Sequence, residues 1–118
     1  MILVDSSVWI DYLRSEHAAL ARALDDGEVL MHPMVVGELA CGHLEPRQPL
    51  LSLLQNLPKA AVASHEEVLG LIELHSLFGR GIGYVDAHLL ASAMLGDNVV
   101  LWTRDRRLNE LARNLELA

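Results

Sequence analysis

Three short apolar runs, each followed by a turn and a helical pattern, limit the folds open to this chain more than any other feature. The runs are Ile2-Leu3-Val4, Val29-Leu30-Met31 and residues 99–102, and each is too short to form a helix. Strands that are apolar at every position are typical of parallel sheets, which are buried on both faces. The sequence therefore predicts an α/β domain in three α/β/α layers, with helices covering both sides of a parallel sheet.

Local signals place the helices between these strands. Pro33 suits the first position of a helix, where its missing N–H does no harm. Ser64 and Glu67 have the spacing of a capping box. We also expect a further short strand at 61–63. The expected helices span 8–13, 18–24, 33–44, 50–57, 64–77, 84–95 and 106–115.

Length and composition predict one globular domain over residues 1–118. Hydrophobic residues make up 52% of the chain and charged residues 21%, which excludes intrinsic disorder. The net charge of -7 excludes a nucleic-acid binder that works by bulk positive charge alone. No stretch approaches the roughly 20 apolar residues that span a bilayer, and the start lacks the pattern of a secretory signal. We therefore expect a cytoplasmic protein without a membrane partner.

The single cysteine, Cys41, excludes an internal disulfide and a four-cysteine zinc site. His32 and His43 lie nearby in the sequence, but their spacing to Cys41 does not fit zinc ligands. We expect Cys41 to pack in the core.

Four carboxylates lie either just after predicted strands or on mostly apolar helices. Asp5 and Asp105 follow the first and last predicted strands, at the edge where parallel sheets gather their working groups. Glu38 and Asp86 lie on two helices that are otherwise mostly apolar. Each residue has a structural alternative, because an Asp can cap or begin a helix and Glu38 can lie on an exposed stripe. Four carboxylates that share one pocket, however, require a counter-charge, and oxygen ligands favour Mg²⁺ or Mn²⁺.

Four sequence motifs resemble those of PIN-domain ribonucleases, in particular VapC-type toxins of toxin–antitoxin pairs. The motifs occur in the family's order and spacing along essentially the whole chain. They are Met1-Ile2-Leu3-Val4-Asp5-Ser6-Ser7-Val8-Trp9-Ile10-Asp11-Tyr12-Leu13, Val36-Gly37-Glu38-Leu39, Tyr84-Val85-Asp86-Ala87-His88-Leu89-Leu90-Ala91 and Leu101-Trp102-Thr103-Arg104-Asp105.

The resemblance implies a PIN-like sheet and an acidic metal site for Mg²⁺ or Mn²⁺, formed by Asp5, Glu38, Asp86 and Asp105. Ser6 and Thr103 correspond to hydroxyl residues that support this site. The chain departs from many relatives directly after Asp105, where Arg106-Arg107-Leu108 stands in place of a further acidic residue. This departure argues against a fifth carboxylate and a strongly held second metal.

The resemblance also implies a function, namely endonucleolytic hydrolysis of RNA by a metal-activated water. A bound Mg²⁺ lowers the pKa of its water and neutralises charge on the phosphate, so no Ser–His or Cys–His nucleophile is needed. The expected partners are a small cognate antitoxin, an RNA substrate with structure, and a second copy in a homodimer. Arg104, Arg106 and Arg107 are candidate phosphate contacts, although they could equally be a solvated helix start.

Other classes of protein fit less well. A phosphoacceptor signalling domain would carry an acidic pair after the first strand and a late lysine, but Ser6-Ser7 follow Asp5 and the only lysine is Lys59. A dehalogenase-type phosphatase would need an Asp where Ser7 stands. A PIN-like module that binds without cleaving remains open, because sequence alone does not measure activity.

Overall fold

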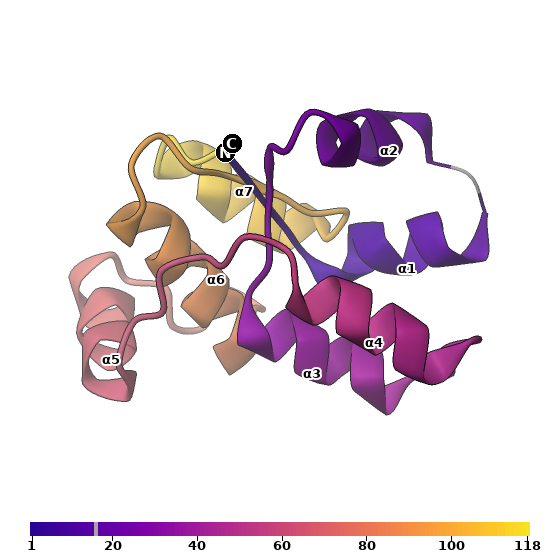
Figure 1. The fold of residues 1–118 in the computed structure, drawn as a ribbon. Helices are drawn as coiled ribbons and strands as arrows, with labels where there is room; N and C mark the ends of the chain where they lie inside the picture. The colour runs from indigo at the N-terminus through magenta and orange to yellow at the C-terminus, as the bar shows by residue number, and fades with distance from the viewer. Residues whose placement is uncertain (16) are drawn as a thin grey trace.

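The computed structural model describes residues 1–15 and 17–118, which form three strands and seven helices (Figure 1). The strands are the three that the apolar runs predict. In chain order the elements are β1 (Ile2–Val4), α1 (Ser6–Arg14), α2 (Ala18–Asp25), β2 (Val29–Leu30), α3 (Pro33–Cys41), α4 (Arg47–Gln55), α5 (His65–Leu74), α6 (Tyr84–Leu95), β3 (Val100–Trp102) and α7 (Arg106–Asn114).

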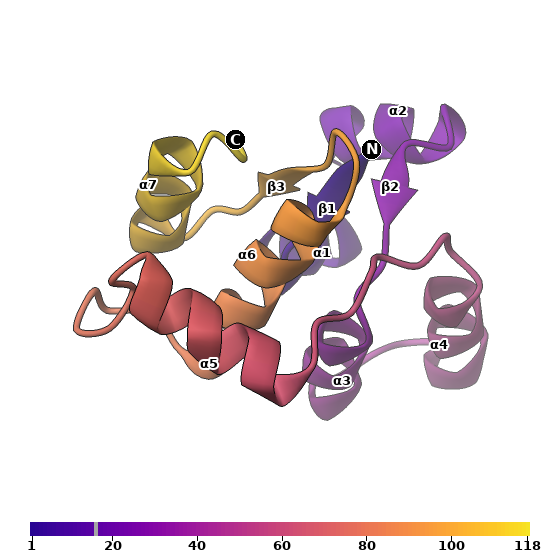
Figure 2. The ribbon, with the colours of Figure 1, turned by 90° about the vertical axis from the view of Figure 1, so that its left-hand side faces the viewer.

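The three strands form a parallel sheet in the order β2-β1-β3, so that β1 lies in the middle. Leu3 pairs with Leu30 on one side and with Leu101 on the other. Helix α6 lies in front of the sheet in Figure 2, and α1 lies behind it. The predicted α/β/α arrangement is therefore confirmed.

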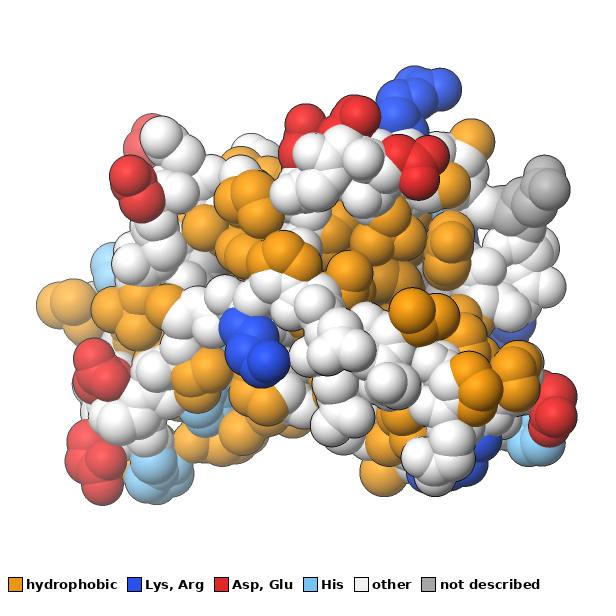
Figure 3. All heavy atoms as spheres, in the orientation of Figure 1, with side chains coloured by type: hydrophobic (Ala, Val, Ile, Leu, Met, Phe, Trp, Pro, Cys, Tyr) orange, Lys and Arg blue, Asp and Glu red, His pale blue; other side chains and the backbone are white. Residues whose placement is uncertain are grey.

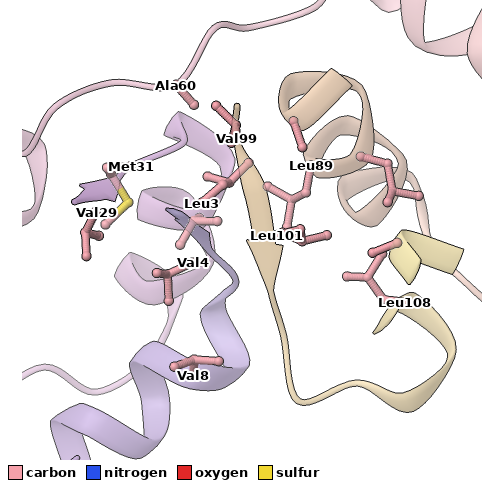
Figure 4. Close-up of a cluster of buried hydrophobic side chains, with 14 of the residues drawn as sticks. Leu3, Val4, Val8, Val29, Met31, Ala60, Leu89, Val99, Leu101 and Leu108 are labelled. Carbon is pink, nitrogen blue, oxygen red and sulfur yellow. The ribbon is translucent and has the colours of Figure 1, made fainter. Parts of the chain in front are cut away.

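The core lies on both faces of β1 and β3 (Figure 4). Leu3, Val4, Leu89 and Leu108 are fully buried. Helix α6 is the most enclosed helix, with its residues from Ala87 to Ala93 all buried. Its almost uniformly apolar sequence is explained by this position, because a helix packed on every side has no polar face.

Several element boundaries differ from the prediction. The strand expected at 61–63 is wrong. The backbone instead pairs earlier, where Met31 N–H donates to the Pro58 carbonyl at 2.7 Å and Ala60 N–H to the Met31 carbonyl at 3.0 Å. Helix α3 ends at Cys41 rather than at 44, because Gly42 is extended. Helix α5 ends at Leu74 rather than at 77, since Ser76 adopts a positive φ of 52°.

No helix in the described part of the chain is long and apolar enough to cross a membrane.

Candidate active site

Two of the four candidate carboxylates lie at the carboxyl edge of the sheet. Asp5 directly follows β1 and Asp105 comes three residues after the end of β3. The two strands are parallel neighbours, and the Asp5 N–H donates to the carbonyl of Trp102 at 2.9 Å. Glu38 comes from the middle of α3, and Asp86 from the first turn of α6. Four separate elements thus contribute the acidic residues.

Asp5 is held by hydroxyl groups from both ends of the chain. Its side chain is 6% exposed, and its Oδ2 accepts hydrogen bonds from Ser7 Oγ and Thr103 Oγ1, each at 2.7 Å. Asp5 occupies the N-cap position of α1, yet its side chain makes no cap hydrogen bond. The capping interpretation is therefore wrong for this residue. Two hydroxyl donors instead satisfy this buried carboxylate and fix its direction.

The same two hydroxyls also fix the turn between β3 and α7. Ser7 Oγ accepts from the backbone N–H of Arg104, and Thr103 Oγ1 accepts from that of Asp105, both at 3.0 Å. Ser7 was not predicted as a supporting residue. The hydroxyl expected in that role, Ser6, lies 3.5 Å from Asp5 Oδ1. The two-residue spacing from Asp5 to Ser7 is a local signal that could have found it.

Asp86 and Asp105 both make the helix-start hydrogen bonds that the structural alternative predicts. Asp105 Oδ1 accepts from the N–H of Leu108 at 3.0 Å and caps α7. Asp86 Oδ2 accepts from the N–H of Gly83 at 3.1 Å. Each bond uses one carboxylate oxygen, so a cap at these positions leaves the second oxygen for a ligand.

The acidic residues influence one another electrostatically. Burial raises the pKa of Asp86, and the charges of Asp5 and Asp105 raise it further, although the bond from Gly83 opposes them. Partial burial likewise raises the pKa of Glu38; the nearby Ser6 hydroxyl lowers it, and the charges of Asp5 and Asp86 raise it. Glu38 is nevertheless largely exposed, in agreement with the structural alternative that it lies on an exposed stripe of its helix. The four carboxylates therefore share one field of negative charge, which favours a cation.

The donor chemistry of this group fits Mg²⁺ or Mn²⁺, because hard cations prefer carboxylate oxygens. In the part of the chain that the structure describes, however, no three Asp, Glu, His or Cys side chains lie close enough together to hold an ion as they stand. Three of the carboxylates are instead engaged in hydrogen bonds of their own, Asp5 with Ser7 and Thr103, Asp86 with Gly83 and Asp105 with Leu108.

The three candidate arginines occupy different environments. Arg104 forms an ion pair with Asp11 of α1, a contact between residues far apart in sequence that the sequence analysis missed. The side chain of Arg107 lies against Gly81, whose positive φ of +81° favours glycine. Arg106 is exposed. The predicted core position of Cys41 is wrong, because this residue ends α3 and is exposed.

Comparison with known proteins agrees with the fold. The PIN domain model matches residues 2–114. Over 108 residues the chain is 50% identical to Ribonuclease VapC32 from each of two strains of Mycobacterium tuberculosis, CDC 1551 / Oshkosh and H37Rv. These alignments cover 92% of this chain and 87% of each relative. The chain therefore belongs to the PIN-domain family, among its VapC-type ribonucleases.

Proposed function

We propose that this protein is a metal-dependent endoribonuclease and the toxin of a toxin–antitoxin pair. It hydrolyses phosphodiester bonds in structured RNA, and its cofactor is Mg²⁺, with Mn²⁺ as a substitute. The observation that carries this proposal is the group of four carboxylates around the carboxyl ends of β1 and β3, of which Asp5 is buried and held by two hydroxyls. The 50% sequence identity to proteins named as ribonucleases supports RNA as the substrate.

The metal would be held by Asp5, Glu38, Asp86 and Asp105, where it would supply an activated water and offset the charge of the scissile phosphate. The protein's own groups have two tasks. Ser7 and Thr103 hold Asp5 in place through their hydrogen bonds to its Oδ2. Burial first, and then the neighbouring carboxylates, raise the pKa values of Asp86 and Glu38, so the ionised forms of both side chains are disfavoured. Binding of a cation relieves this repulsion, so the site is prepared for metal by its own electrostatics.

Substrate positioning falls to the arginines after β3. Arg106 and Arg107 are exposed in the first turn of α7, next to Asp105. The net charge of -7 gives little long-range attraction for a phosphate backbone, so local contacts must hold the RNA. Recognition by such local contacts favours unstacked nucleotides of a single-stranded loop over a regular duplex.

We expect Arg106→Ala and Arg107→Ala each to raise KM for RNA roughly 3- to 10-fold and to lower the slope of log affinity against log salt by about one unit. Arg104→Ala should behave differently, because it also breaks the ion pair with Asp11 and so loosens the turn before Asp105. The matched control is Arg22→Ala, which removes the same charge from α2, beside Ile2 at the other end of β1. Equal effects of Arg22→Ala and Arg106→Ala would contradict a local phosphate contact.

An apolar groove between α1 and α3 is suited to a segment of the antitoxin. It has a volume of about 410 Å³, and Ile10, Leu13, Leu39 and Leu44 line it. Glu38 stands at the same groove, so a segment lying there reaches the acidic site. We place the C-terminal part of the antitoxin in this groove, with an Arg or Lys taking over the charge of the metal.

This placement predicts competition between antitoxin and metal. Inhibition of cleavage by the antitoxin should weaken as Mg²⁺ rises, because both neutralise the same carboxylates. The measurement is the inhibition constant at several Mg²⁺ concentrations and constant ionic strength, with Ca²⁺-free NaCl as the balancing salt. An inhibition constant independent of Mg²⁺ would contradict the shared site.

A homodimer and a cytoplasmic location complete the proposal. Figure 3 shows apolar side chains gathered across the middle of one face. Several large apolar residues are strongly exposed, among them Leu74 at 78%, Leu53 at 65% and Phe78 at 61%. Exposure on this scale is typical of surfaces that pair with another chain. The cytoplasm is where structured RNA substrates are found.

The experiment that tests the proposed function maps new 5′ ends in total RNA after induced expression of the chain. We expect cleavage at a few loop positions, with 5′-phosphate products, and dependence on Mg²⁺ or Mn²⁺. Cleavage of a plain DNA duplex as fast as structured RNA would overturn the choice of substrate. RNA binding without any cleavage, at any divalent metal, would favour the binding module considered above.

A further inference from the structure

Among the residues that the structure describes, three polar atoms on α6 and at the N-terminus of α3 are buried without a protein partner. They are His32 Nε2, His88 Nδ1 and Ser92 Oγ, on side chains that are 0%, 4% and 1% exposed. The ring centroids of His32 and His88 are 5.7 Å apart, and Ser92 lies one turn beyond His88 on the same face of α6. A buried polar atom without a partner costs about 1–3 kcal/mol, so each of these atoms calls for a hydrogen-bond partner.

The position of the proton on His32 follows from its contacts. His32 Nδ1 accepts a hydrogen bond from the N–H of Met34 at 3.1 Å, and it therefore carries no proton. Burial and the neighbouring His88 lower the pKa of His32 to about 4, so the ring is neutral at pH 7. A neutral imidazole has one N–H. The unpartnered Nε2 of His32 is thus a hydrogen-bond donor.

The proton on His88 is placed by Tyr84 and His65. The Tyr84 hydroxyl lies 2.6 Å from His65 Nδ1 and 3.0 Å from His88 Nε2, but it has only one proton to donate. Hydroxyl donors make shorter hydrogen bonds than N–H donors. Tyr84 therefore donates to His65 and accepts from His88 Nε2–H. This assignment leaves a lone pair on the unpartnered Nδ1 of His88.

A donor on His32 and an acceptor on His88 are complementary, and Ser92 Oγ can serve as either. We propose that one internal water molecule binds here, accepting from His32 Nε2–H, donating to His88 Nδ1 and bonding to Ser92 Oγ. Three hydrogen bonds are the usual number for a buried water. The result is one directional chain that runs from His32 through the water, His88 and Tyr84 to His65.

This chain joins the helices that carry two of the four carboxylates. His32 is the N-cap of α3, which carries Glu38, and Tyr84 is in the first turn of α6 with Asp86. His65 anchors the chain at the start of α5. Tyr84 is therefore a positioning residue for Asp86. Only this consequence rests on the proposed function; the water and the two proton positions do not.

The first test is NMR on the full chain at pH 7 without metal, with ¹⁵N-labelled histidine. We expect His32 and His88 both to carry the proton on Nε2, and a nuclear Overhauser contact from a long-lived water to the rings. A proton on Nδ1 of His88, or the absence of this water from a crystal structure that resolves buried waters, would overturn the chain. Neither result depends on whether the protein cleaves RNA.

The second test is Tyr84→Phe, which removes the hydroxyl and keeps the ring. The proton on His88 should then distribute between both nitrogens, while His32 keeps its pattern. The kcat for RNA should fall about tenfold at unchanged KM, which is the lower range for groups that support metal ligands. Tyr12→Phe is the matched control, because it removes a hydroxyl from α1, and it should change neither. An altered His88 pattern with full kcat would overturn the positioning role.

Discussion

Asp5→Asn should reduce the rate of RNA cleavage by on the order of a hundredfold or more, because it removes the most deeply buried carboxylate of the proposed metal site. Asn keeps the size of the side chain and can still accept from Ser7 and Thr103. The loss is therefore one of charge rather than of packing. Single-turnover cleavage at saturating Mg²⁺ measures the effect, and Glu38→Gln, Asp86→Asn and Asp105→Asn should follow the same direction.

The control for this series is Asp97→Asn, an exposed carboxylate in the turn between α6 and β3 that should retain full activity. A stability measurement separates lost metal binding from misfolding. In EDTA at pH 7, Asp86→Asn should melt about 2–5 °C above the wild type, since burial and the charges of Asp5 and Asp105 disfavour the ionised side chain. Normal cleavage by all four variants would contradict the metal site, whereas lower melting temperatures for all four would contradict only the repulsion.

Acidification should destabilise the protein through His32. Burial and the nearby His88 hold the pKa of this residue at about 4, against 6.5 for an ordinary histidine. The unfolded chain therefore binds a proton before the folded one does, and stability falls as pH drops from about 6.5 towards 4. The full difference is worth roughly 3 kcal/mol. Urea unfolding at pH 7, 6, 5 and 4.5 gives the free energy of unfolding directly.

His32→Asn should remove this part of the pH dependence. The Asn side-chain oxygen can accept from Met34 N–H in place of Nδ1 and keep the cap of α3, but it does not titrate. His43→Asn serves as the control for the loss of one imidazole, because His43 is fully accessible at the surface. If the variant and the wild type lose equal free energy between pH 7 and 4.5, His32 is not the group responsible.

Local sequence signals were sufficient for most of the secondary structure. Helix α6 begins at Tyr84 and ends at Leu95 as predicted, since Gly83 and Gly96 bound an apolar segment. The capping box of Ser64 and Glu67 is present. The wrong predictions concern segments whose structure depends on contacts with distant parts of the chain. The expected strand at 61–63 is absent because Met31 pairs with the backbone around Lys59 instead.

For the candidate site, too, some features were predicted from the sequence and others were not. Sequence motifs singled out the four carboxylates, and the parallel strands predicted that Asp5 and Asp105 would meet at one edge. The roles of their neighbours were not visible in the sequence. Ser7 and Thr103 are 96 residues apart, yet both bond to the same oxygen of Asp5. Arg104, predicted as a phosphate contact, is paired with Asp11 on another helix.

Residue types and their spacing predicted the class of fold, the order of the elements and the four acidic residues of the proposed site. These predictions depend on local patterns, such as a three-residue apolar run that is too short for a helix. Packing of the helices on the sheet decides which hydroxyls hold Asp5, which backbone N–H groups bond to Asp86 and Asp105, and which buried imidazole nitrogens lack a partner among the described residues. The contact of Thr103 with Asp5 joins residues that are distant along the chain, and its geometry exists only after the helices have packed on the sheet.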